Sequence, residues 1–489
     1  MLVMIRKIAF FGIPLCLFWG WSVEAKAPMN ILLITADDHG VQAGCYGDEQ
    51  ARTPNLDRLA SHGTLFQNAY VAHSSCSSSR SSILTGKYPH ETGQIGLAHL
   101  GYTMKSGQLS LPGKLAEAGY RTGIIGKHHV APFSDVPFQW SRTSDYRAKD
   151  DGQGDTSYSV YERGRLIEDM AGFASEFFEQ NKASETPFFL YLNYSDPHKP
   201  FQADVKGYPR VKFKPGDIKP FDYLAPGEAT QAELADYYNC ISRMDTGVGM
   251  VLDRLDELGL RNNTLVIYLG DNGEPFPHAK ATINQPGLHV PLIIDWPEKS
   301  RPGLEVQSPV SIVSVFSTVL DAAGIYLETS GPGSLGDYLS GKQEPFGPVF
   351  SEMNAHGVPQ YKPQRCVFLD GYKLIIDLLD SSETDPSMFS QLRTDGETVF
   401  YKSCRLYNLD KDALEKNDLS GSPEMDALKK KMLKHITRWM IETNDPWLSL
   451  ENARAIALAH EESRVSGDGL HWDGSAETQA IIPSLRYHK

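Results

Sequence analysis

Two pairs of oxygen donors stand out among the residues that could do chemistry. Asp37 and Asp38 are adjacent, and Asp271 and Asn272 form a second adjacent pair far along the chain. Carboxylate and amide oxygens suit Ca²⁺ or Mg²⁺, whereas zinc prefers nitrogen and sulfur ligands. Each pair alone is more often a helix cap or a turn. Taken together with the cysteine motif described next, the four side chains predict one divalent-metal site.

A cysteine in a serine-rich stretch is the candidate nucleophile. The stretch begins Cys76-Ser77-Ser78-Ser79-Arg80 and ends with Leu84-Thr85-Gly86. One interpretation is an inert, packed cysteine, and another is a thiol made reactive by nearby cations. We expect Ser79 and Arg80 to open a helix whose N-terminus supplies N–H donors to an anion.

Basic side chains elsewhere could complete an anion site. Lys127 and His129 are two residues apart, so on an extended segment they point to the same side. His198 lies in the proline-bracketed turn Asp196-Pro197-His198-Lys199-Pro200, and Lys280 comes eight residues after the second oxygen pair. Each could be an ordinary loop residue if it stood alone. As a set they predict cations for an anion, with one imidazole fixed by the turn.

The elements that must position these residues alternate between strands and helices. Apolar runs predict buried strands at residues 29–35, 188–194 and 265–269. Shorter patterns predict strands at 122–125, 290–296, 365–368 and 372–376, and helices at 111–118 and 312–323. Helices are also expected after the cap Thr53, with Pro54 first, and at the capping box Thr230-Gln231-Ala232-Glu233. Because both oxygen pairs and His198 directly follow strands, the site is expected at the carboxyl edge of an open α/β sheet.

The chain is expected to comprise a secretory signal and two domains. Residues 1–27 place Arg6 and Lys7 before an apolar run and small residues, which is typical of a cleaved export signal. This predicts a periplasmic or secreted protein, or a lysosomal one if the source is an animal. Residues 28–345 form the predicted catalytic domain. Residues 346–489 predict a smaller C-terminal α+β domain that ends in an amphipathic helix with Met425 to Trp439 on its apolar face.

Composition excludes several classes of function. With 489 residues, 41% hydrophobic and 22% charged, the chain has the composition of a soluble globular protein. Its formal net charge of −14 argues against nucleic-acid or anionic-membrane partners. A local basic cleft can still bind an anion, because charges are screened beyond about 8–10 Å. The cysteines form no CxxC pair, so neither a zinc site nor a disulfide-dense scaffold is expected.

Five motifs, in this order, resemble those of the type I sulfatases of the alkaline-phosphatase-like superfamily. They are Ala36-Asp37-Asp38, Cys76 to Gly86, Gly126-Lys127-His128-His129, Asp196-Pro197-His198 and Asp271-Asn272-Gly273. Within this family the chain is most similar to the N-sulfoglucosamine sulfohydrolases, or sulfamidases, in three further segments: Arg243 to Gly249, Pro275-Phe276-Pro277 and Thr443 to Trp447. The resemblance implies a large, mostly parallel sheet flanked by helices, with a smaller C-terminal α+β domain.

The resemblance also implies a nucleophile and a metal. Cys76 would be oxidised to formylglycine by a formylglycine-generating or an anaerobic sulfatase-maturing enzyme, and the hydrated aldehyde would attack sulfur to form a covalent sulfo-enzyme. The third residue of that short motif is usually proline, or alanine in some members, and here it is Ser78. One Ca²⁺, with Mg²⁺ as the alternative, would be bound by Asp37, Asp38, Asp271, Asn272 and the modified Cys76.

The remaining candidates receive roles from the same resemblance. Arg80 and Lys127 would hold the hydrated aldehyde, and His129 would assist its hydroxyl group. His198 would protonate the leaving group, and Lys280 would bind the sulfate. Sulfamidases carry arginine near the position of Lys280, whereas many O-sulfatases have lysine there.

The function implied is that of an exported, Ca²⁺-dependent sulfatase acting on a sulfated glycan. The N-sulfo group of glucosamine in heparin or heparan sulfate is the leading substrate. Three alternatives stay open: an O-sulfatase on another sulfated polysaccharide, a phosphonate or phosphodiester hydrolase of the same superfamily, and a non-catalytic glycan-binding relative in which Cys76 stays a thiol. Neither a nucleic-acid partner nor membrane insertion after signal cleavage is expected.

Overall fold

The computed structural model describes most of the chain between residues 28 and 466. The described ranges are 28–143, 164–184, 186–328, 330–341, 347–357, 360–381, 389–394 and 397–466. The expected signal segment, 1–27, lies outside them. Within these ranges, no helix combines the length and the apolar character needed to cross a membrane.

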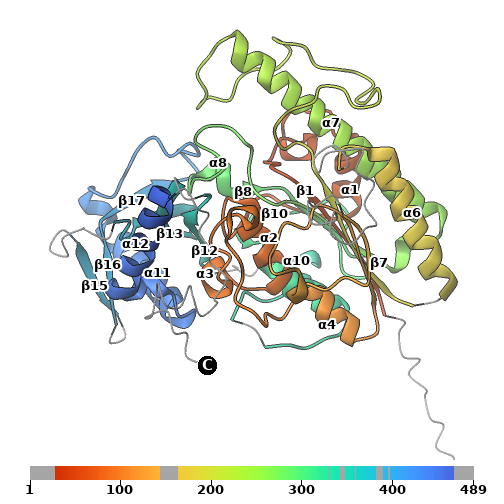
Figure 1. Ribbon diagram of the computed structural model, residues 1–489. Helices are drawn as coiled ribbons and strands as arrows, with labels where there is room; N and C mark the ends of the chain where they lie inside the picture. The colour runs from red at the N-terminus through yellow and green to blue at the C-terminus, as the bar shows by residue number, and fades with distance from the viewer. Residues whose placement is uncertain are drawn as a thin grey trace, which may run out of the picture.

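An eight-stranded sheet forms the centre of the larger domain (Figure 1). Its order is β10-β2-β9-β7-β1-β6-β4-β5. Four neighbouring strands run parallel: β7 (Thr264–Gly270), β1 (Asn30–Ala36), β6 (Phe188–Tyr194) and β4 (Arg121–Gly126). The other strands are β2 (Thr64–Phe66), β5 (Trp140–Thr143), β9 (Leu292–Asp295) and β10 (Leu304–Val306). Only β9 runs antiparallel to its neighbours, so the predicted mostly parallel sheet is confirmed.

Helices cover both faces of this sheet, which is why its central strands are apolar throughout. Leu32 and Ile34 of β1 pack with α1 (Pro54–His62), α6 (Ile167–Ser184) and α7 (Glu228–Glu257). The alternate side chains of β1, Ile31 and Leu33, face a second core formed with α2 (Cys76–Thr85), α4 (Leu111–Glu117) and α9 (Ser314–Ala322). Every residue of β1, β6 and β7 is therefore buried, as expected for strands covered on both sides.

Two predicted boundaries are wrong. The helix expected to start with a capping box at Thr230 begins at Glu228, and the Thr230 hydroxyl donates instead to the Ala225 carbonyl. The strand expected over residues 290–296 is broken at Pro291, since proline has no N–H to donate to a ladder. Its first part is β8 (His289–Val290), which joins β3 (Ala69–Tyr70) and β11 (Val310–Ser311) in a separate three-stranded sheet.

The C-terminal region is a smaller antiparallel sheet covered by helices. Its four strands are β12 (Val349–Ala355), β13 (Tyr361–Leu369), β14 (Tyr372–Asp377) and β17 (Ser403–Asn408). A second pair, β15 (Ser390–Thr394) and β16 (Glu397–Tyr401), forms a hairpin. The helix predicted to be the last is α11 (Asp426–Glu442), but α12 (Leu450–Ser466) follows it. The predicted division at residue 345 falls outside the described ranges and stays a prediction.

A buried polar network joins helix α3 (Pro89–Thr92) to the C-terminal region. The backbone N–H of His90 donates to Glu352 Oε1 over 2.9 Å, and the His90 ring contacts the other oxygen of the same carboxylate. His90 Nε2 lies 2.8 Å from Thr443 Oγ1. Arg365 donates to both oxygens of Asp445, over 2.6 and 3.0 Å. Figure 1 shows β12, which carries Glu352, beside α3 (Pro89–Thr92), so the network lies where the two regions meet.

Candidate active site

The four parallel strands deliver the predicted residues to one edge of the large sheet. Asp37 and Asp38 follow β1, and Asp271 and Asn272 follow its neighbour β7. On the other side of β1, β6 leads to His198 and β4 leads to Lys127 and His129. The expectation that these residues meet at the carboxyl edge of the sheet is therefore fulfilled in the geometry.

The oxygen donors form a compact, fully buried group. The N–H of Asp38 donates to Asp271 Oδ1 over 3.0 Å, and the Asn272 amide donates to Asp38 Oδ1 over 2.9 Å. Potential ligand atoms of Asp37, Asp38, Cys76 and His198 all lie within 4.8 Å of one another. Three buried oxygens, Asp37 Oδ1, Asp38 Oδ2 and Asn272 Oδ1, accept no hydrogen bond. Buried oxygens without donors are costly, and a hard divalent cation is the partner that such a donor set fits.

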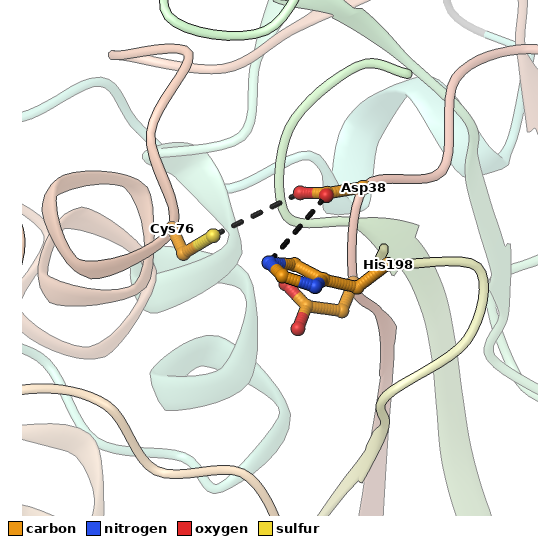
Figure 2. A group of neighbouring side chains, drawn as sticks. Asp38, Cys76 and His198 are labelled. Carbon is orange, nitrogen blue, oxygen red and sulfur yellow. Dashed lines mark hydrogen bonds and ion pairs between the residues drawn. The ribbon is translucent and has the colours of Figure 1, made fainter. Parts of the chain in front are cut away.

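Cys76 is the first residue of α2, three positions before the expected start of that helix. Its side chain is 1% exposed, and its Sγ lies 3.8 Å from Asp38 Oδ1. Figure 2 shows Cys76 and His198 both directed toward Asp38. Burial raises the pKa of the Cys76 thiol to about 12, against the lowering effect of Lys127 and Lys280. An unmodified thiol at this place is therefore protonated at neutral pH and a poor nucleophile.

Three cations surround the carboxylates. Arg80 Nε lies 2.9 Å from Asp271 Oδ2, and Lys127 Nζ lies 2.7 Å from Asp37 Oδ2. Lys280 Nζ lies 2.6 Å from Asp38 Oδ1, so this lysine also reaches the site. Burial raises the pKa of Asp37, but Lys127 and the other nearby cations outweigh it and hold that pKa well below its usual value.

A pair of arginines fixes the turn that carries His198. Arg243 donates to both oxygens of Asp196 over 2.7 and 2.9 Å, and Arg165 Nε donates to the same carboxylate over 2.9 Å. Arg165 also donates to the His198 carbonyl over 2.5 Å. The His198 ring faces the oxygen donors, with Nε2 3.7 Å from Asp38 Oδ2. The sequence predicted no role for these two arginines, although Asp196 belongs to the motif Asp196-Pro197-His198.

The segment that carries Lys127 and His129 differs in backbone conformation from the extended one that was expected. His129 has φ 57°, a left-handed conformation that is rare for non-glycine residues, so the segment is not simply extended. His128, for which no role was expected, packs against Phe133 and Phe138. His129 Nε2 lies 2.8 Å from His99 Nδ1.

Two histidines beside the site had no role in the sequence-based prediction. His99 contacts His129, and His356 Nδ1 lies 2.9 Å from the hydroxyl of Ser75, next to Cys76. These contacts join residues 30 and 281 positions apart. No local pattern could have revealed them, because neither histidine belongs to a motif with a characteristic spacing.

A pocket of about 610 Å³ lies elsewhere, against the C-terminal sheet. It is lined by aromatic and acidic residues that include Tyr70, Tyr223, Glu274, Tyr372 and Asp410. None of its described lining residues is a lysine or an arginine, so it does not suit a sulfate. The cluster around Cys76 is the better anion site.

Comparisons with known proteins agree with this geometry. The family model described as Sulfatase matches residues 29–325. Human N-sulphoglucosamine sulphohydrolase is 32% identical over 472 residues, which cover 86% of this chain and 91% of that protein. A solved structure in complex with its substrate D-glucosamine-2-N,6-O-disulfate is 20% identical, with a TM-score of 0.65 and coverage of 86% of this chain and 99% of that one. The phosphonate monoester hydrolase of Agrobacterium radiobacter is 19% identical, with a TM-score of 0.66 and coverage of 86% and 97%.

Proposed function

This chain belongs to the sulfatase family of sulfuric ester hydrolases, and from that premise we propose that it removes the N-sulfo group from glucosamine residues of heparin or heparan sulfate. The likeness to human N-sulphoglucosamine sulphohydrolase along 86% of the chain supports this substrate class. The observation that carries the proposal is the cluster of Asp37, Asp38, Cys76 and His198, whose potential ligand atoms lie within 4.8 Å of one another. We also propose export through residues 1–27.

The donor set supports one Ca²⁺ as the resident metal. The carboxylates of Asp37, Asp38 and Asp271, the Asn272 oxygen and modified residue 76 would hold it, and three of these oxygens otherwise lack a hydrogen-bond donor. The bound cation would stabilise negative charge on the sulfuryl oxygens. Mg²⁺ is the alternative ion.

Residue 76 fits conversion to formylglycine by a maturing enzyme. Its side chain is buried at the first position of α2 and faces Asp38. Burial raises the pKa of its thiol, and the charges of Lys127 and Lys280 lower it. The hydrated aldehyde would supply a hydroxyl group as the nucleophile, whereas a protonated thiol is a poor nucleophile. Ser78 replaces the usual proline or alanine of the maturation motif, so the extent of conversion is the first property to measure.

The basic side chains around residue 76 would position its hydroxyl group and bind the sulfate. Arg80 and Lys127 are held in place by Asp271 and Asp37, where they would position the hydroxyl of residue 76. Lys280 would bind a sulfate oxygen, for which it exchanges its contact with Asp38. His129 would take part in proton transfer at that hydroxyl.

His198 would donate a proton to the leaving nitrogen. The clamp formed by Arg165 and Arg243 on Asp196 fixes the turn from which this ring projects. Protonation by a positioned side chain is required because an amine is a poor leaving group as an anion.

An O-sulfatase acting on another sulfated polysaccharide is the second candidate. The observation in its favour is Lys280, which lies near the position where sulfamidases carry arginine. The likeness to the phosphonate monoester hydrolase, at 19% identity, concerns the fold alone.

Mass spectrometry of the tryptic peptide that contains Cys76 tests the nucleophile directly. Conversion to formylglycine should lower its mass by about 18 Da relative to the thiol peptide. Assays of the converted protein on N-sulfated and O-sulfated glucosamine then separate the two candidates. An intact thiol in protein from its native host would refute the formylglycine mechanism and favour the glycan-binding alternative.

A further inference from the structure

Strand β12 carries part of the C-terminal region to the segment that precedes Cys76. The N–H of Glu352 donates to the Ala72 carbonyl over 2.7 Å, and the N–H of Asn354 donates to His73 Nε2 over 3.0 Å. The last residue of the strand, Ala355, donates to the Ile95 carbonyl over 3.2 Å. The strand is therefore fixed by hydrogen bonds from three of its residues to the segments on both sides of Cys76.

His356 comes directly after this strand and is held beside the nucleophile. Its Nδ1 lies 2.9 Å from the hydroxyl of Ser75, the residue immediately before Cys76. The ring is half-buried. Besides burial, the charge of Lys280 lowers its pKa, and the charge of Asp38 raises it. Burial is the main cause that lowers the pKa of His356 to about 3, so this ring is neutral at neutral pH.

A second imidazole is held from the other side of Cys76. The hydroxyl of Ser77 accepts a hydrogen bond from the N–H of Ala98 over 2.9 Å, which fixes the short 3-10 helix η2 (Ala98–Leu100). His99 of this helix is exposed, and Lys127 and Lys280 act on its ring. The serines on both sides of Cys76 thus each anchor a segment that brings a histidine to the same group of cations.

We propose that His356 and His99 bind the hydroxyl groups of the sugar ring that carries the sulfate, and that they decide which sulfated sugar is accepted. This inference rests on the proposed function. In the proposed function, Lys280 already binds the sulfate, and Arg80 and Lys127 position the hydroxyl of residue 76. A neutral imidazole is a better partner for a hydroxyl group than for a sulfate. It can donate a hydrogen bond through one nitrogen and accept one through the other, and a hydroxyl group can do both as well.

The roles of the two histidines differ in how directly they can be tested. His99 also contacts His129, so its removal is expected to slow the reaction of every substrate. His356 instead contacts Ser75, which has no role in the proposed proton transfer. The decisive variant is therefore His356→Ala, with His356→Gln as a conservative partner that keeps a donor and an acceptor.

The experiment compares two substrates of the converted enzyme, glucosamine N-sulfate and 4-nitrophenyl sulfate. Both present the same sulfuryl oxygens, but only the first carries sugar hydroxyls. His356→Ala should lower kcat/KM for the sugar by roughly 10–30-fold, chiefly through KM, and by no more than about threefold for the aryl sulfate. His356→Gln should recover part of the loss. His435→Ala is the matched control, since His435 is also half-buried but lies on α11 among Lys431, Arg438 and Asp370.

Each outcome decides the matter. An equal fall with both substrates, or no fall with the sugar, overturns the inference, and melting temperatures identify a variant that has merely lost its fold. If the wild type cleaves only O-sulfated glucosamine, the N-sulfo assignment fails, but the same ratio measured with that sugar still tests His356. A wild type that cleaves the aryl sulfate and no sulfated sugar refutes both proposals.

Discussion

Two buried clusters of charge, one at the edge of the large sheet and one between helix α3 and the C-terminal sheet, differ in how completely they are paired. In the second cluster, Glu352 Oε1 accepts from His90 N and Asn354 Nδ2, and its Oε2 contacts the His90 ring. Both oxygens of Asp445 likewise accept hydrogen bonds from Arg365. Every carboxylate oxygen of that cluster has a donor.

The cluster at the sheet edge has the same burial but not the same saturation. Asp37 Oδ1, Asp38 Oδ2 and Asn272 Oδ1 accept no hydrogen bond, although Arg80, Lys127 and Lys280 are close. A structural ion pair is stable only when its remaining polar atoms are satisfied. Incomplete pairing at equal burial therefore separates a site built for a ligand from a site built to hold two regions together.

The largest effect is expected from removing the proposed nucleophile. Cys76→Ala should reduce sulfatase activity by at least about 10³-fold, the scale seen when a catalytic nucleophile is lost. The melting temperature should change little, because the buried Sγ makes only a weak 3.8 Å contact with Asp38. Cys404→Ala, a half-buried cysteine of the C-terminal sheet, serves as the control and should retain activity. Retained activity in Cys76→Ala would show that the sheet-edge cluster is not the catalytic site.

Metal removal should distinguish the two clusters next. A chelator should abolish turnover, and Ca²⁺ at 100 times its Kd should stabilise the protein by about 2.7 kcal/mol. For a chain of this size we expect a rise in Tm of roughly 2–5 °C, measured by scanning calorimetry. Asp37→Asn should remove this rise. Asp445→Asn should lower Tm but leave the calcium-dependent rise in place. Loss of that rise in Asp445→Asn would contradict the assignment of metal binding to the sheet-edge cluster alone.

Breaking the saturated cluster should reduce stability rather than catalysis. Glu352→Gln should cost about 3–5 kcal/mol of unfolding free energy, the range for breaking a buried pair. Chemical denaturation at pH 6 measures this cost. At a temperature where the variant is folded, kcat/KM should stay within about threefold of the wild type. A large loss of kcat/KM in the folded variant would show that the network serves catalysis directly.

The same cluster also predicts a pH dependence. Burial raises the pKa of Glu352, but His90 and Arg365 outweigh it and lower this pKa to about 2, from an ordinary value of 4.5. The stabilisation from Glu352 is therefore complete above pH 4.5 and is lost as the pH falls toward 2. Burial lowers the pKa of His90, but Glu352 outweighs it and raises that pKa above 6.5, so the contribution of His90 is complete below pH 6.5 and is lost at higher pH. The stability difference between wild type and Glu352→Gln should thus be largest between about pH 4.5 and 6.5.

The smallest effect concerns the serine in the maturation motif. The Ser78 hydroxyl is buried without a hydrogen-bond partner, so Ser78→Ala should leave stability unchanged or slightly raised. Because alanine occurs at this position in related motifs, we expect the converted fraction of Cys76 to rise by roughly twofold when the same maturing enzyme is used. Ser79→Ala is the matched control, since its hydroxyl is also buried and unpartnered. Equal conversion in both variants would show that residue 78 does not limit maturation.

The sequence by itself determined the sheet and the edge at which the predicted site residues meet. The apolar runs that predicted β1, β6 and β7 are confirmed, because strands covered on both faces must be apolar throughout. Polar residues directly after such strands are brought to one edge by the parallel arrangement alone. This is why Asp37, Asp271 and His198 could be placed together from the sequence.

Only the tertiary structure decided what surrounds that site. The pairings of His356 with Ser75 and of Arg165 with Asp196 join segments that no local pattern relates. Helix α2 begins at Cys76 because of its packing, not because of a cap signal: Ser75 accepts no capping hydrogen bond. Hydrophobic period and turn chemistry are local properties of the chain, whereas these contacts depend on how distant segments cross, and that is fixed only when the two sheets pack together.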